Sequence, residues 1–157
     1  MNYRLYDIED LVLVGRIFEV KWKDLNRLKT WIKETDQALK AKQNALGILN
    51  FNVRIGITQH IIPEGFMYFT GYRVKSASDV AGYDYLTFPK NRLLVSKTIT
   101  LHSIQKTYLS LAEWIDDSSY VPFKASGTSY YDTLPIKIEW YYKQKGTVKV
   151  GIPIVLK

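Results

Sequence analysis

Cysteine is absent from the 157 residues, and histidine occurs only at His60 and His102. Without thiols the chain cannot form disulfides, thiolate metal sites or a cysteine nucleophile. Two histidines argue against a histidine-rich metal centre. The sequence also has no Ser-His-Asp set, no phosphate-binding loop and no second acid matched to the one glutamate considered below. We therefore expect neither a cofactor nor a metal.

Long apolar runs are absent as well. No segment approaches the roughly 18 apolar residues of a membrane span, and residues 1–7 lack the apolar run of a signal peptide. These features predict a cytoplasmic protein of bacterial type that does not enter a membrane. The length fits one domain over residues 1–157, which would bury about two-thirds of the surface of the unfolded chain.

The formal net charge is +7, which would suit a nucleic-acid partner if the basic residues were clustered. They are spread along the chain, and the densest group, between Lys21 and Lys42, falls on the expected outer face of a helix. No helix-turn-helix, zinc-finger or RRM signature accompanies it. Direct binding of nucleic acid is therefore only a minor alternative.

Hydrophobic periodicity divides the chain into two similar halves, about residues 1–76 and 83–157. The first half predicts, in order, a strand, an amphipathic helix and two strands over residues 10–20, 22–42, 46–59 and 66–74. After a polar link over residues 75–82, the second half repeats that order over residues 85–99, 101–116, 134–142 and 147–156. This repetition suggests a duplication.

A duplicated strand-helix-strand-strand unit predicts an α+β fold. One such unit has a small sheet with a helix on a single face, and two units together form a more stable antiparallel sheet. We expect both long helices on one side of that sheet and a concave groove on the other. The side chains expected to pack under the helices are Leu49, Phe51, Val53, Met67, Phe69, Ile136, Ile138, Trp140, Val150 and Ile152.

Residues 134–142 carry a glutamate in the middle of a predicted strand. Ile136, Ile138 and Trp140 alternate with Lys137, Glu139 and Tyr141, so that the two sets point to opposite faces. A solvated glutamate on an open face is the simpler interpretation. Because tyrosines gather on the same predicted face, a small-molecule groove is the alternative. Its expected lining is Asn50, Asn52, Arg54, Tyr68, Tyr72, Glu139 and Tyr141.

Two segments near the end of the chain also have a familiar form. Ile138-Glu139-Trp140-Tyr141, followed by Thr147–Ile154 with its Ile-Pro-Ile ending, resembles the close of GyrI-like domains, also called AraC-type effector-binding domains. Glu113-Trp114 is similar to the tryptophan near the end of their second helix, and Phe88-Pro89 to the proline before their fourth strand. The chain departs from that pattern at Leu93, usually an aromatic residue, and has no glycine between Lys97 and His102.

The resemblance implies a groove with a central glutamate, here Glu139, that recognises lipophilic or aromatic cations. Trp114 would join the ligand contacts if the second helix borders the groove. The implied function is a stand-alone effector-binding protein in transcription regulation or in a multidrug or toxin response. Two alternatives stay open. One is a hydrolase of strained electrophiles, with Glu139 activating water and Tyr141 or Tyr68 donating a proton. The other is a protein-interaction module such as a DNA gyrase inhibitor, whose protein partner the sequence does not identify.

Overall fold

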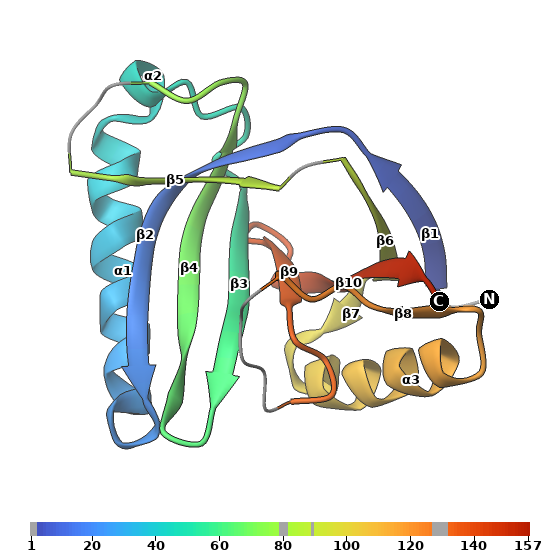
Figure 1. Cartoon of the computed structure of the whole chain (residues 1–157). Coiled ribbons are helices and arrows are strands. Elements are labelled where there is room, and N and C mark those ends of the chain that lie inside the picture. Colours follow the sequence, from blue (N-terminus) through green and yellow to red (C-terminus); the bar gives the residue numbers. More distant parts are fainter. Residues whose placement is uncertain (1–2, 79–81, 89, 127–131) are drawn as a thin grey trace.

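The computed structural model describes residues 3–78, 82–88, 90–126 and 132–157. Pro89, which is part of the resemblance noted above, and the middle of the 75–82 link lie outside these residues. The described chain is α+β, as predicted: one antiparallel sheet carries two long helices (Figure 1). The strand order is β1-β6-β10-β9-β3-β4-β2-β5, and β7 and β8 also pair with β10.

The first half of the chain supplies four strands and the longer helix. Its elements are β1 (Tyr3–Ile8), β2 (Leu11–Lys21), a 3-10 turn at Trp22–Asp24, α1 (Leu25–Ala41), the single turn α2 (Gln43–Leu46), β3 (Val53–Ile62) and β4 (Gly65–Val74). Gly47 ends the helical segment in the left-handed conformation, with φ of 72°, as the sequence predicts.

The second half has the same order with two short additions. Its elements are β5 (Asp84–Phe88), β6 (Asn91–Ser96), β7 (Ile99–Thr100), a 3-10 turn at Leu101–Ser103, α3 (Ile104–Asp116), β8 (Tyr120–Pro122), β9 (Lys137–Tyr142) and β10 (Thr147–Leu156). α1 lies along β2 and β4, whereas α3 lies against β10, β8 and β6 (Figure 1).

The halves exchange their first strands. β1 pairs with β6, and β5 pairs with β2, so each half holds a strand of the other. The strand β1 was not predicted, because only its partner in the second half makes it part of a sheet. The halves also join in the middle, where β3 pairs with β9 from Val53 opposite Tyr142 to Thr58 opposite Lys137.

The two faces of the sheet are buried in different ways. On one face the curled sheet packs against itself. The core cluster there includes Leu13, Ile57, Phe69, Leu93 and Ile138 and contains no residue from either long helix. The sheet is curled enough for β2, β5 and β6 to cover the same side of β3 and β9. The other face carries both helices, through clusters centred on Leu39 for α1 and Leu111 for α3.

The expected placement of the groove relative to the helices is therefore corrected. Glu139 and Tyr141 lie on the face that carries the helices, and Ile138 lies on the face that closes on itself. Alternation along the strand separated the two sets correctly, but the curl of the sheet decided which set meets a helix. Leu49, expected in the core, is 58% exposed.

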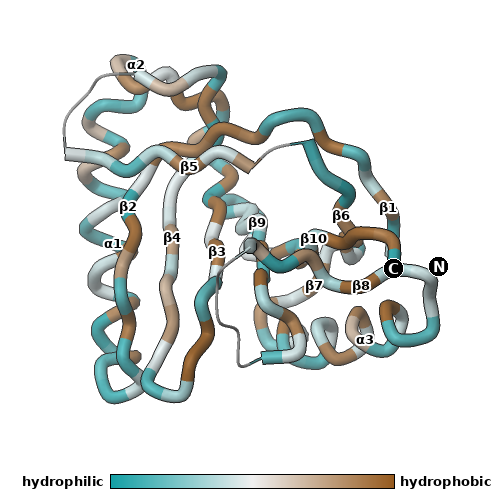
Figure 2. The backbone as a smooth tube through the Cα atoms, in the orientation of Figure 1, coloured by the Kyte–Doolittle hydropathy of each residue, from teal (hydrophilic) through white to brown (hydrophobic). Residues whose placement is uncertain are grey.

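Hydropathy along the chain follows this arrangement. Most of α1 is hydrophilic or neutral, whereas the neighbouring β2 carries long hydrophobic stretches (Figure 2). A helix that covers a sheet with one face needs only one apolar stripe, while a strand buried on both faces is apolar throughout. Among the described residues no helix combines the length and apolar character needed to cross a membrane.

Candidate functional site

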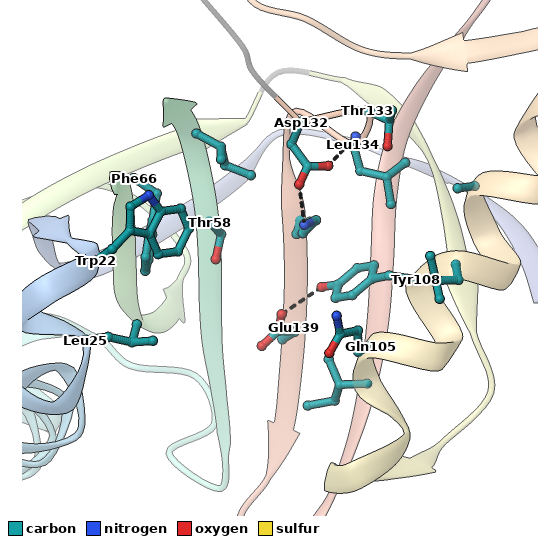
Figure 3. Close-up of a pocket in the computed structure, with 15 residues that line it drawn as sticks. Trp22, Leu25, Thr58, Phe66, Gln105, Tyr108, Asp132, Thr133, Leu134 and Glu139 are labelled. Atoms are coloured by element: carbon teal, nitrogen blue, oxygen red, sulfur yellow. Dashed lines mark hydrogen bonds and ion pairs between the residues drawn. The ribbon is translucent and has the colours of Figure 1, made fainter. Parts of the chain in front are cut away.

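A groove of about 450 Å³ opens on the face of the sheet that carries the helices. Trp22 and Leu25, at the start of α1, form one wall together with Phe66 of β4 (Figure 3). Side chains of α3 form the opposite wall, and β3 and β9 form the floor between them. The lining residues from α3 are Ile104, Gln105, Tyr108, Leu109 and Ala112. This volume lies within the range of small-molecule sites.

Glu139 lies on the floor and accepts hydrogen bonds from two tyrosines. The Tyr108 hydroxyl donates to Oε2 of Glu139 at 2.8 Å, from α3 across the groove (Figure 3). The Tyr141 hydroxyl, from the same strand, donates to Oε1. Both carboxylate oxygens are thereby held in position, while the glutamate itself is only half-buried.

The environment keeps both phenols protonated. Burial raises the pKa of Tyr108 well above its ordinary value, and the charge of Glu139 adds to that increase. The pKa of Tyr141 is raised first by burial and then by the charge of Glu139. At neutral pH the two hydroxyls are therefore donors, which is the role that Glu139 requires of them.

Arg54 and Tyr68 lie beside this cluster on β3 and β4. Nη1 of Arg54 donates to the Tyr68 hydroxyl at 3.1 Å and to Oγ1 of Thr70 at 3.0 Å. The guanidinium carbon lies 4.2 Å from the ring centroid of Tyr141, within the range of a cation–π contact. Arg54 thus interacts with Tyr68, Thr70 and Tyr141 rather than with the carboxylate of Glu139.

An ion pair lies at one end of the groove. Nζ of Lys137 is 3.2 Å from Oδ2 of Asp132, and it also lies 5.6 Å from the ring centroid of Tyr108. Lys137 and Glu139 share a strand face, but the charge of Lys137 is taken up by Asp132. Within the described part of the groove floor, the carboxylate of Glu139 therefore has no ion-pair partner.

The structure brings three of the six predicted site residues together: Glu139, Tyr141 and Tyr68. Tyr72 lies under α1, where its hydroxyl donates to Asp36 at 2.6 Å. Trp114 is a partly buried residue of α3 that packs against the core cluster around Leu111 and stacks on Tyr120, with ring centroids 6.2 Å apart. Asn52 is exposed in the turn before β3. Of the six, Glu139 lines the groove, whereas Tyr141, Tyr68, Tyr72, Trp114 and Asn52 are not among its described lining residues.

Several lining residues were not expected from the sequence. The spacing of Tyr108 and Trp22 fits the apolar stripes of the helices predicted over residues 101–116 and 22–42, which gives no reason to place either side chain in a site. The polar group on each ring, a hydroxyl or an indole N–H, was the feature that could have indicated a role beyond packing, since a buried Tyr or Trp usually needs a hydrogen-bond partner. Trp22 has one outside its helix: its indole N–H donates to the carbonyl of Pro63 at 2.8 Å. Among the described residues no group of three potential ligands could hold a metal ion.

Comparisons with known proteins identify the fold. No protein-family model and no curated protein matches the sequence. SAV2435, in a structure bound to tetraphenylphosphonium, matches with a TM-score of 0.67 and 14% identity, over 99% of this chain and 94% of that chain. The C-terminal domain of EcmrR matches with a TM-score of 0.65 and 14% identity, over 99% and 98%. The chain shares the fold of these proteins.

A third solved structure with this fold is a hydrolase from Listeria innocua. It matches with a TM-score of 0.59 and 8% identity, over 98% of this chain and 92% of that chain. A further structure of EcmrR is a complex with DNA, in which the match covers 59% of the EcmrR chain. The likeness to SAV2435 and EcmrR agrees with the GyrI-like resemblance of the sequence.

Proposed function

We propose that this protein binds a lipophilic organic cation in the groove, with Glu139 as the counter-charge, and acts as an effector-binding protein. The observation that carries the proposal is the environment of Glu139. Its two oxygens accept hydrogen bonds from neutral phenols. Within the described part of the chain, no Lys, Arg or His nitrogen lies within 4.0 Å of them.

An unpaired carboxylate in a half-buried position attracts a cation more strongly than one in bulk water, because the effective dielectric constant is lower there. The aromatic rings around it add cation–π attraction of about 0.5 to 2 kcal/mol. A cation without N–H groups fits this site well, since the tyrosine hydroxyls already supply hydrogen bonds to the carboxylate.

The walls favour an apolar ligand. Trp22 and Leu25 on one side are each 48% exposed, and Leu109 on the other is 64% exposed. Large hydrophobic side chains grouped at one hollow often mark a binding site. A ligand with aromatic or alkyl arms would remove these surfaces from water, at about 25 cal/mol for each Å² of apolar surface buried.

The comparisons support the ligand class and the wider role. SAV2435, which has this fold, was crystallised with tetraphenylphosphonium, a lipophilic cation. EcmrR carries the fold in a protein that binds DNA, which supports a place for this chain in transcription regulation or in a response to toxic compounds. The stand-alone role and cytoplasmic location expected from the sequence stay predictions.

The test is a calorimetric titration with tetraphenylphosphonium. We expect saturable binding by the parent chain and binding about tenfold to a hundredfold weaker by Glu139→Gln, which keeps the side-chain volume and removes the charge. Glu113→Gln is the matched control, because Glu113 is an exposed carboxylate of α3 outside the groove. Neutral triphenylphosphine oxide should bind to the parent chain and to Glu139→Gln with similar affinity. Equal cation affinity in the parent and Glu139→Gln would contradict the proposal.

Hydrolysis of a strained electrophile is the second candidate function. It is favoured by the fold likeness to the Listeria innocua hydrolase and by the presence of two phenol donors at the Glu139 carboxylate. Glu139 would then activate water, and Tyr141 would protonate the leaving oxygen. Mass spectrometry of an aryl epoxide incubated with the chain distinguishes the two functions: a diol that forms with the parent but not with Glu139→Gln would indicate an enzyme.

A further inference from the structure

The face of the sheet opposite the helices holds a second concave surface, which the cation groove does not reach. It consists of two adjoining hollows of about 360 and 250 Å³ that share Ile8, Leu93 and Trp140. We call it the Trp140 hollow. The larger part is completed by Asp7, Glu9, Leu11 and Arg73, and the smaller by Tyr6, Val95, Tyr142 and Lys149.

The indole of Trp140 is a platform at the centre of this hollow. A Cβ atom on Gly151 of β10 would lie 2.8 Å from Cζ3 of Trp140 and 3.1 Å from Cη2, so the ring lies directly against the backbone of that strand. Trp140 is nevertheless only half-buried and lines both parts of the hollow. The absence of a side chain at Gly151 thus leaves room for the indole, and the part of the indole that stays accessible borders both parts of the hollow.

Around the Trp140 platform the acidic side chains have basic partners, whereas two basic side chains have no acidic partner among the described residues. Asp7 pairs with Arg92 at 2.7 Å, and Glu9 lies 3.9 Å from Lys90. Lys149 lies 5.9 Å from the ring centroid of Tyr142. Among the described residues neither Arg73 nor Lys149 has a carboxylate within 4.0 Å. The smaller part of the hollow has aromatic and aliphatic walls, one lysine and no acid in its lining.

We propose that the Trp140 hollow is a second ligand site, which binds a planar aromatic anion with its ring on Trp140 and its anionic group at Lys149. Stacking on an indole suits any flat aromatic system. The unpaired ammonium of Lys149 selects an anion, and larger members of the class extend toward Arg73. The two faces of the sheet thus have opposite charge preferences, and this second site does not depend on the cation groove.

The test uses 2-naphthoate, with neutral 2-naphthylmethanol as the matched probe, and follows the indole N–H signals by NMR. We expect 2-naphthoate to shift the signal of Trp140, and tetraphenylphosphonium to shift that of Trp22 in the groove. Lys149→Gln should weaken 2-naphthoate about three- to tenfold and leave the cation unaffected. Lys145→Gln, which removes an exposed charge outside the hollow, should change neither affinity.

Three results would overturn the second site. They are the absence of a Trp140 shift at millimolar 2-naphthoate, equal affinity for the neutral alcohol, and unchanged 2-naphthoate affinity in Lys149→Gln. Because Glu139→Gln should not alter 2-naphthoate binding, failure of the cation proposal and failure of this one are seen in different measurements. The substitution at Lys149 avoids the folding defect that replacement of Trp140, which packs against the core, would introduce.

Discussion

At the scale of single residues, Gly56 makes room for Tyr68 beside the Glu139 cluster. It lies between Thr70 of β4 and Glu139 of β9 in the sheet register. A Cβ atom at this position would be 2.2 Å from the hydroxyl oxygen of Tyr68 and 3.0 Å from its Cζ. Because Arg54 holds that hydroxyl at 3.1 Å, the ring cannot move away without losing a hydrogen bond. The need for glycine here is one of space.

Gly56→Ala should lower the free energy of unfolding by about 1 to 3 kcal/mol, the usual cost of overpacking a well-filled site. Tyr68→Phe removes the atom nearest to the new methyl group, so the same substitution should cost clearly less in a Tyr68→Phe background. Urea denaturation of the four chains gives the coupling between the two positions. An equal cost in both backgrounds would show that the contact with the Tyr68 hydroxyl is not the reason for the glycine.

At the scale of elements, a small cluster ties α1 to both halves of the sheet. Asp36 of α1 accepts a hydrogen bond from Tyr72 of β4 and lies 3.7 Å from Nζ of Lys143, just after β9. The same ammonium lies 3.5 Å from the ring centroid of Phe51, which stacks on Tyr72 at 4.4 Å. Tyr72, expected from the sequence as a ligand contact, therefore has a complete set of partners beneath the helix.

Tyr72→Phe should cost about 1 to 2 kcal/mol of stability, because Asp36 loses a hydrogen-bond donor while the ring can remain stacked. Hydrogen exchange should become faster in α1 and stay unchanged in α3. Tyr83→Phe is the control: among the residues that the structure describes, the hydroxyl of Tyr83 makes one hydrogen bond, a long one of 3.5 Å to the carbonyl of Ala38, so its loss should cost less than about 0.5 kcal/mol. A large fall in tetraphenylphosphonium affinity in Tyr72→Phe would return Tyr72 to the ligand site.

At the scale of the whole molecule, four tyrosines share one electrostatic property. Burial raises the pKa of Tyr68, Tyr72, Tyr108 and Tyr141 above the ordinary value of 10.0. Each therefore keeps its proton in the folded chain at a pH where the unfolded chain would lose it. The unfolded state then binds fewer protons, so stability falls as pH rises. This contribution is fully present below pH 10.0 and is lost above it.

We expect the free energy of unfolding to fall steeply above about pH 10, by up to roughly 1.4 kcal/mol for each pH unit and each tyrosine. Lys143 has the opposite effect on stability. Burial lowers its pKa from 10.5, so the cost of keeping its ammonium charged in the folded chain disappears as the pH rises toward that value. Urea midpoints between pH 8 and 11, with tyrosinate absorbance at each pH, measure the effect. Tyrosinate formation near pH 10 at all twelve tyrosines, without unfolding, would contradict it.

Local pattern alone determined the two long helices and the two faces of the strand that carries Glu139. Alternation in residues 134–142 placed Ile138 and Glu139 on opposite sides, and the helical stripes of both halves correspond to α1 and α3. Such properties depend on neighbours within a few residues, where the geometry of strand and helix is fixed. The same holds for Gly47, whose freedom at positive φ ends the first helical segment.

Only the tertiary structure decided what each face meets. The period of a strand separates two sets of side chains, but the curl of the whole sheet placed Leu13 and Leu93 against the set with Ile138, and α3 against the set with Glu139. The exchange of β1 and β5 likewise depends on pairing between distant segments. Tyr108 became part of the site for the same reason: its spacing places it on the buried face of a helix, and only the packing of α3 on the sheet brings its hydroxyl to the carboxylate of Glu139.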